Sequence, residues 1–203
     1  MVQARALGYV YSDHVYFRMI SPQLRDRTDA CAIFKGGLKA HVRALRPTDE
    51  SMLRDLFYHL SERSVYLRYF SKRRSMPHDN LQKYVSLSED KGLSLVVTIG
   101  PRENRRMIAE GRYVFGDDDP YPDVAIMVNE QYKSRGIGTF LLEYLIEIAK
   151  ERGIEGFRAD VLPDNDPMLW ILRKLPYRSR KQYANGVLEI RFSFDDLKED
   201  TSS

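Results

Sequence analysis

Two spacings of hydrophobic residues alternate along this chain from about residue 39 onward. Alternating or short continuous apolar runs predict strands, whereas apolar residues spaced three and four apart predict helices. The segment LKAHVRALRP alternates as a strand, and Thr48 is the expected N-cap of a helix over DESMLRDLFYHL. We expect Asp49, Glu50 and Glu62 to be first-turn charges or to face solvent. The apolar face of the helix consists of Met52, Leu53, Leu56, Phe57 and Leu60.

Three buried strands follow a short helix that we expect from Pro77 to Val85. Their sequences are LSLVVTI, MIAEGRYVF and DVAIMV, and the turn-rich segments between them are short, which predicts an antiparallel meander. The remaining elements are a helix from Gly138 to about Arg152, the strand GFRADVL, a helix from about Asn165 to Leu175, and the strands YRSRKQYA and GVLEIRFSF around a turn at Asn185 and Gly186. This order predicts a mixed α/β (α+β) fold, a mostly antiparallel sheet flanked by helices.

The two ends of the chain are patterned differently from the region 39–194. Residues 1–38 mix aromatic, strand-like pieces with the charged segment QLRDRTD and have no clear period. They suit an added hairpin, an oligomer contact such as that of a homodimer, or the tail of a longer parent chain. Residues 195–203 include the charged segment LKEDTSS, and we expect a disordered tail there.

Composition excludes several classes of protein. A chain of 203 residues that is 43% hydrophobic can bury a substantial core in one domain with an appendage, or in two small domains. It has no apolar run of about 18 residues, so we expect no membrane span, and it begins without the apolar region of a secretory signal. A single cysteine, Cys31, excludes an internal disulfide framework and a cysteine-based zinc site. We therefore expect a cytoplasmic protein.

Charge and histidine spacing add two further expectations. The net charge is only +3, and the basic cluster SKRRS at residues 71–75 is typical of a solvated loop, with contact to an acidic or phosphorylated partner as the alternative. No nucleic-acid-binding motif accompanies it, so we do not expect a nucleic-acid partner. The histidines at positions 14, 41, 59 and 78 lack metal-ligand spacing, so we expect no metal site.

The segment VNEQYKSRGIGTFLLEYLIEIAKERG, residues 128–153, has the strongest chemical signal. An apolar strand is followed by two cations, two glycines and a long amphipathic helix whose first amide groups have no partner within the helix. Free N–H groups and the positive end of the helix dipole favour a phosphate group. Gly136 and Gly138 would admit it to the backbone, and Lys133 and Arg135 add cationic donors. We call residues 133–139 the anion cradle.

Other interpretations of this segment remain. The glycines can be turn residues only. A P-loop would need GxxxxGK[ST], which is absent. A dinucleotide fingerprint would need glycine at position 141, which is Leu141, and it would place the first glycine directly after the strand. Asp160 lies at about the distance expected of a ribose ligand, but within a strand rather than at its end.

The segment KSRGIG resembles the [RQ]xxGx[GA] pyrophosphate motif of the GNAT N-acetyltransferases, with Lys133 in the place of Arg or Gln. The segments DVAIMVNEQYKSRGIGTFLLEYL and VLPDNDPMLWILRKLPY are similar to the family's strand, loop and helix and to its next strand and helix. Upstream, VRALRPTDESMLRDLFYHLSERSVYLRYF is similar to the GNAT domain of bacterial protein-lysine acetyltransferases of the Pat type. The resemblance runs from about Lys39 to Tyr177, within a GNAT domain expected at 39–194.

The resemblance implies acetyl-CoA as the co-substrate and a sheet in which two strands splay apart around its pantetheine arm. Backbone groups of Ile126 to Val128 would pair with the arm, and amides of Ser134 to Thr139 would bind the pyrophosphate. Asn165 is a helix cap that also stands near the cofactor. The implied cofactor-binding residues are Ile126, Met127, Val128, Lys133, Ser134, Arg135, Gly136, Ile137, Gly138, Thr139 and Asn165.

An amine must lose a proton to attack a thioester, so a general base is expected. Asp123 stands where Pat-type sequences place a catalytic Glu, and Glu110 on the preceding strand is the alternative. Alternatively, neither residue is catalytic. In that case Asp123 closes the DDDPYPD turn, and Glu110 is an exposed carboxylate on its strand. The position of the general-acid Tyr found in many members is Leu172 here, and we expect Trp170 and Met168 to be core residues.

Two functions follow from these residues. The first is an N-acetyltransferase that uses acetyl-CoA, with a protein lysine preferred to a small amine as acceptor. The second is a non-catalytic acyl-CoA-binding module that regulates a partner. The regions expected to shape the acceptor site, residues 53–74 and 177–194, are rich in Tyr, Arg and Lys with few carboxylates. This composition favours an acidic-flanked lysine over a polyamine.

Overall fold

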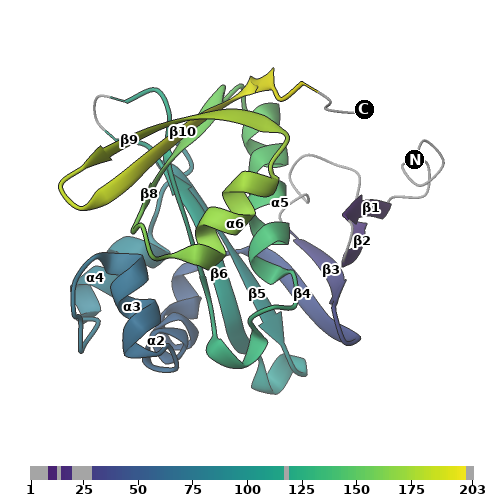
Figure 1. The fold of residues 1–203 in the computed structure, drawn as a ribbon. Coiled ribbons are helices and arrows are strands. Elements are labelled where there is room, and N and C mark those ends of the chain that lie inside the picture. The colour runs from purple at the N-terminus through teal and green to yellow at the C-terminus, as the bar shows by residue number, and fades with distance from the viewer. Residues whose placement is uncertain (1–8, 13–14, 20–28, 117–118, 200–203) are drawn as a thin grey trace.

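The structure is a computed structural model that describes residues 9–12, 15–19, 29–116 and 119–199, with side chains from residue 29 onward. Its strands form one sheet in the order β1-β2-β3-β4-β5-β6-β7-β8-β10-β9 (Figure 1). The strands are β1 (Tyr9–Ser12), β2 (Val15–Met19), β3 (Asp29–Phe34), β4 (Leu38–Ala44), β5 (Gly92–Ile99), β6 (Arg106–Val114), β7 (Asp123–Val128), β8 (Gly156–Val161), β9 (Tyr177–Ala184) and β10 (Val187–Leu197). The α-helices are α2 (Glu50–Tyr58), α3 (Glu62–Tyr69), α4 (His78–Val85), α5 (Ile137–Glu151) and α6 (Asp166–Lys174), and the short 3-10 helices are η1 (Pro47–Asp49), η2 (Arg102–Asn104) and η3 (Glu130–Tyr132).

The sheet is mostly antiparallel, as the sequence predicts. Only β7 and β8 run parallel to each other, and β5, β6 and β7 form the expected meander. Helices cover both faces of the central strands: α5 and α6 lie on one side, and α2, α3 and α4 on the other (Figure 1). Among the described helices, none has the length and apolar content needed to cross a bilayer.

Two hydrophobic cores hold these layers together. The larger core joins α5 to the sheet, and its helix contributes Ile137, Phe140, Leu141, Leu142, Tyr144, Leu145, Ile146, Ile148 and Ala149. The smaller core joins α2, α3 and α4 to the other face, around Leu53, Leu56, Phe57 and Val65. Because both faces of β5 and β6 are covered, these strands are buried almost throughout, which explains their continuous apolar runs.

The sheet extends beyond the expected boundary at residue 39 and into the expected tail. That boundary falls inside β4, and the preceding strand β3 pairs with β4 and buries Ala30, Ala32 and Phe34 in the larger core. The hairpin β1–β2 pairs with β3, while residues 1–8, 13–14 and 20–28 lie outside the described residues. At the other end, Asp195 to Leu197 are part of β10 rather than of a disordered tail. Residues 200–203 are outside the described range.

A buried ion pair joins β4 to the first helices. The Arg43 guanidinium donates to both carboxylate oxygens of Asp49, at 2.6 and 2.8 Å, and the backbone N–H of Arg46 donates to Asp49 at 2.8 Å. Both side chains are about 95% buried. Asp49 is a first-turn charge, one of the two expected alternatives, but it is buried rather than solvent-facing. The expectation for Thr48 was wrong, because it lies within η1 rather than at the N-cap of α2.

We expect Asp49→Ala to lower the free energy of unfolding by about 3–5 kcal/mol, because it leaves the buried Arg43 without its counter-charge. Urea unfolding at neutral pH measures this change. Asp55→Ala is the matched control, because Asp55 is exposed on α2 and should change stability by less than about 0.5 kcal/mol. Equal effects of the two substitutions would contradict a structural role for the Arg43–Asp49 pair.

Candidate active site

The parallel strands β7 and β8 meet at one end and then diverge. Their only paired position is Asp123 opposite Arg158, next to a hydrogen bond of 3.0 Å from the Arg158 N–H to the Pro122 carbonyl. Both strands continue for several residues beyond this point, to Val128 and Val161, without a further pair. The facing backbone edges are therefore without a strand partner beyond that pair, which is where a ligand could pair with the sheet.

The N-terminus of α5 lies at the end of the diverging strand β7. Gly136 is its N-cap, with φ of 84°, and no side chain caps the helix. The helix bonds begin with the Phe140 N–H, which donates to the Gly136 carbonyl, so the three preceding amides have no partner within the helix. Ser134 is also left-handed, with φ of 58°, a conformation uncommon for a non-glycine residue. This is the geometry of an anion site made by backbone amides.

Lys133 is engaged by neighbouring side chains. Its Nζ donates to Ser64 Oγ at 2.6 Å and lies 2.7 Å from Glu130 Oε2. The other oxygen of Glu130 accepts hydrogen bonds from Ser61, from Oγ at 2.7 Å and from the backbone N–H at 3.1 Å. Partial burial raises the pKa of Glu130, but the hydrogen bonds from Lys133, Ser64 and Ser61 outweigh it and lower the pKa to about 2. These contacts attach the N-terminus of α3 to the loop before α5.

Arg135 joins the cradle to the turn between β3 and β4. Its Nη1 donates to the Lys35 carbonyl, and the Lys35 N–H donates to the Arg135 carbonyl, each at 3.3 Å. A Cβ atom on Gly36 would lie 3.1 Å from Arg135 Nη1, and Gly36 has φ of 80°. Sequence reasoning missed this contact, although the Gly-Gly pair at residues 36–37 was a turn signal.

Gly138 has a packing role that the sequence did not suggest. A Cβ atom there would lie 3.0 Å from Ile171 Cδ1 on α6, 3.9 Å from Ile126 and 4.0 Å from Val128. The missing side chain therefore lets α5 approach α6 and β7 closely. Asn165 caps α6, because its side-chain oxygen accepts a hydrogen bond from the Met168 N–H at 3.3 Å.

The other residues singled out on α6 divide between core and surface. Leu172, in the position of the family's Tyr, is buried in the larger core. Met168 is half-buried and packs against that core. The expectation for Trp170 was wrong, because its side chain is 46% exposed and Lys174 lies 5.3 Å from its ring centre. The hydrophobic face of α6 thus turns Leu172 inward and leaves Trp170 outside.

Asp123 is held by an arginine. Arg158 Nε donates to one of its carboxylate oxygens at 2.7 Å and Nη2 donates to the other at 2.6 Å. Accepting a proton from an amine would therefore discharge this ion pair. The sequence did not reveal Arg158 as a partner, although the alternation of GFRADV places Arg158 on the face opposite the buried residues Phe157 and Ala159.

Glu110 is completely buried rather than exposed on its strand. Its side chain lies on β6 opposite Met127, its nearest described cation is Arg112 Nε at 3.5 Å, and neither oxygen has a hydrogen-bond partner among the described residues. Arg68 Nε, Tyr69 Oη and Arg112 Nη2 are likewise buried without a hydrogen-bond partner among the described residues. Burial raises the pKa of Tyr69, and the neighbouring Tyr84 and Glu110 raise it further, whereas Arg68 opposes the shift.

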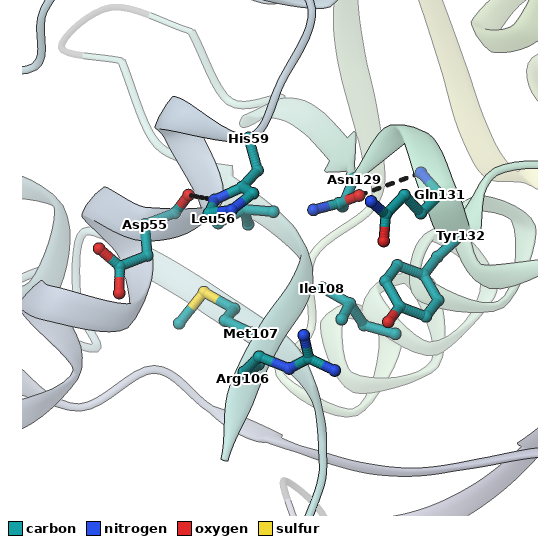
Figure 2. A pocket seen from close by; sticks show the side chains of 9 residues that line it. All are labelled: Asp55, Leu56, His59, Arg106, Met107, Ile108, Asn129, Gln131 and Tyr132. Atoms are coloured by element: carbon teal, nitrogen blue, oxygen red, sulfur yellow. Dashed lines mark hydrogen bonds between the residues drawn. The ribbon is translucent and has the colours of Figure 1, made fainter. Parts of the chain in front are cut away.

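A separate cavity of about 160 Å³ lies beside the loop that leads to α5 (Figure 2). It is formed by the end of α2, the start of β6 and residues 129–132, and its lining includes His59, Asn129 and Tyr132. His59 Nδ1 contacts the Asp55 carbonyl at 2.7 Å. Neither Asp123 nor Glu110 lines this cavity, so the structure does not bring it together with the candidate bases. Within residues 29–116 and 119–199, no cluster of three metal-ligating side chains was found.

The depressed pKa of Glu130 predicts a pH-dependent contribution to stability. Its pKa is below the ordinary value of 4.5, so its contacts stabilise the fold above about pH 4.5 and lose this effect as the pH falls toward 2. We expect Glu130→Gln to cost at most about 1 kcal/mol at pH 7, since the group is partly exposed, and much less near pH 2.5. Urea unfolding at both pH values tests this. A pH-independent cost of Glu130→Gln would contradict the prediction.

Comparison with known proteins supports one family. A sequence model of the Acetyltransferase (GNAT) family matches residues 57–174. Acetyltransferase Pat of Mycolicibacterium smegmatis is 40% identical over 70 residues, which cover 34% of this chain and 21% of that protein, so the match spans about a fifth of the relative's length. The GNAT domain of S. lividans PAT superposes with a TM-score of 0.73 at 25% identity, over 81% of this chain and 96% of that one. The cAMP-binding acyltransferase from Mycobacterium smegmatis superposes with a TM-score of 0.55 at 26% identity, over 81% of this chain and 47% of that one.

These matches confirm the resemblance to a Pat-type GNAT domain and the predicted fold class. The segment matched by the family model contains the diverging strands β7 and β8, the anion cradle and α6. The chain belongs to the Acetyltransferase (GNAT) family.

Proposed function

We propose that this protein is an N-acetyltransferase that transfers the acetyl group of acetyl-CoA to lysine side chains of proteins. The observation that carries the proposal is the divergence of β7 and β8 beside the uncapped N-terminus of α5. A helix N-terminus offers amide donors to a pyrophosphate, and a free strand edge offers backbone hydrogen bonds to the amide groups of a pantetheine arm. The two features lie at opposite ends of one short segment, residues 126–139.

In this proposal the backbone amides of Ser134 to Thr139 bind the pyrophosphate, and the freed edge of Ile126, Met127 and Val128 pairs with the arm. Lys133 contributes its charge once it exchanges its contacts with Ser64 and Glu130 for a phosphate oxygen. Arg135 already lies against the turn at Lys35, so it adds charge near the cradle while holding that turn in place. Asn165 marks the start of α6 on the far side of the arm.

The acceptor is proposed from the relatives and from the charges on α3. One relative is named an acetyltransferase Pat, and the chain resembles the Pat-type protein-lysine enzymes in sequence. Arg68 and Arg73 both lie against the ring of Tyr69, at 5.2 and 4.9 Å from its centre, near the end of α3. The exposed cations that follow α3, Lys72, Arg73 and Arg74, suit acidic residues around a lysine and repel a polyamine. We place the reaction in the cytoplasm.

One observation favours a second function, an acyl-CoA-binding module without catalysis. Asp123 stands where Pat-type sequences place a catalytic Glu. Both of its carboxylate oxygens accept hydrogen bonds from Arg158. A protein that binds acetyl-CoA but has no carboxylate to receive the amine would regulate rather than acetylate. Measuring acetyl-CoA binding by calorimetry and acetyl transfer to lysine peptides on the same sample separates the two functions.

We expect Gly136→Asp to abolish acetyl-CoA binding. The new carboxylate at the N-cap would accept hydrogen bonds from the amide N–H groups that would otherwise bind the pyrophosphate. Calorimetry measures the affinity, and circular dichroism checks the fold. Gly153→Asp is a matched control: Gly153 follows the other end of α5, has a similar φ of 75° and has open space around its Cβ position. It should carry a similar backbone strain and bind normally. Normal acetyl-CoA binding by Gly136→Asp would show that the phosphates bind at another site.

We also expect peptides with a lysine flanked by Asp or Glu to be acetylated with a higher kcat/KM than spermidine, because the neighbouring arginines attract the flanks and repel a second ammonium group. A thiol-release assay with both substrates at low ionic strength measures the ratio. The preference should shrink at high salt. Efficient acetylation of spermidine would show that these charges do not select the acceptor.

A further inference from the structure

Beyond their single paired position, β7 and β8 carry a row of side chains on the face opposite α5. Phe157, Ala159 and Val161 of β8 pack in the larger core, so the alternating residues Arg158 and Asp160 turn to the other face. The same alternation on β7 places Asp123 and Ala125 there, since Val124, Ile126 and Val128 pack on the α5 side.

The pairing registers show which side chains are level with each other. Arg112 of β6 is opposite Ala125, and Asp160 of β8 is opposite Glu189 of β10. Because β7 and β8 are parallel and Asp123 is level with Arg158, Ala125 is level with Asp160. The row therefore reads Arg112, Ala125, Asp160, Glu189 across four strands. It is the first row after the strands begin to separate.

Ala125 is the smallest side chain of this row and is only half-buried. Its neighbours on either side are an arginine on β6 and an aspartate on β8. A small residue at the point where two strands separate leaves room on the sheet for a group that arrives from the face opposite α5. In the proposed function the thioester lies between the same two strands, so this is where an acceptor amine would reach it.

Asp160 differs from every other carboxylate in its neighbourhood, because its own oxygens make no hydrogen bond or ion pair with a described residue. Arg158 forms an ion pair with Asp123. Arg191 forms ion pairs with Asp119, through Nη2 at 2.8 Å, and with Glu189, through Nε at 2.8 Å. On α3, Arg63 is likewise paired with Asp164 at 2.7 Å. The arginines thus neutralise the surrounding carboxylates and leave Asp160 unpaired. Burial raises the pKa of Asp160; Asp123 and Glu189 raise it further, while Arg158 and Arg191 lower it.

We infer that Asp160 is the carboxylate that binds the acceptor ammonium group and takes its proton. The inference rests on the proposed function and names a catalytic residue for it. Asp160 differs from Asp123 because no arginine engages its carboxylate, and it differs from Glu110 because it is exposed beside the point where the strands separate. Glu110 lies one row further along the meander and is completely buried.

The step balances with these groups alone. The lysine ammonium gives one proton to Asp160, which releases it to solvent, and the neutral amine attacks the thioester carbon. The carbon–nitrogen bond forms, the carbon–sulfur bond breaks, and its electron pair leaves with the CoA sulfur. The second proton of the nitrogen neutralises that thiolate. The products are the acetylated lysine, CoA thiol and one proton in solution.

The test compares Asp160→Asn with Asp123→Asn and with Asp195→Asn, an exposed carboxylate of β10 outside the row. We expect Asp160→Asn to lower kcat/KM for a lysine peptide by about 10²- to 10⁴-fold, with acetyl-CoA affinity by calorimetry unchanged. Raising the pH toward the amine pKa should recover part of the loss, because free amine then forms without a base. Asp160→Glu should keep part of the activity. Asp195→Asn should stay within about threefold of the wild type, since Asp195 is exposed on β10 and lies outside the row.

The outcomes separate the inference from the proposed function. If the wild type binds acetyl-CoA but acetylates no lysine peptide, the proposed function and the inference fall together. If the wild type is active and Asp160→Asn matches its rate and pH profile, the inference alone is overturned. It is also overturned if Asp195→Asn is as inactive as Asp160→Asn, or if Asp123→Asn is inactive while Asp160→Asn is active. Urea unfolding of each variant excludes loss of fold as the cause.

Discussion

The single point of pairing between β7 and β8 is the constraint on which the site depends. At that point a bidentate ion pair between Asp123 and Arg158 reinforces the one place where the parallel strands touch. Charge-assisted, two-pronged contacts of this kind hold both partners in a fixed geometry. With the strands joined there and covered by α5 on one face, their free edges can only open toward the loop at residues 129–136. The proposed cofactor path and the row at Ala125 both begin where the strands separate beyond this pair.

Helix α3 connects the parts on either side of the opening. Its first turn reaches the loop before α5 through Ser61 and Ser64, and it reaches the segment after β8 through Arg63 and Asp164. A group that displaces Lys133 from Ser64 would therefore loosen one of these attachments while the other stays in place. In the proposed function, phosphate binding at the cradle would in this way be coupled to the position of α3 over the sheet.

Local pattern predicts most of this fold, and contacts between distant segments account for what it missed. The meander, α5, α6 and the final hairpin follow from periodicity and turn residues within short windows. The cradle could likewise be found from Lys133, Arg135 and two glycines. The partner of Asp123, however, is 35 residues away, and the reason for a glycine at position 138 is a side chain on α6. The burial of Asp49 likewise depends on a partner, Arg43, that belongs to the preceding strand. No spacing rule contains such pairs.

The choice of aspartate at position 123 also bears on where the chemistry can take place. Pat-type sequences place a Glu there, and the shorter Asp keeps its carboxylate close to the backbone of β7, within reach of both Nε and Nη2 of Arg158. A carboxylate so held is part of the frame of the site. One row further, the strands have separated, the facing residue is an alanine, and the next carboxylate is unpaired. If the proposed acetyl transfer uses a base on this face of the sheet, Asp160 is the carboxylate free to act, because Asp123 is engaged in the ion pair that joins the two strands.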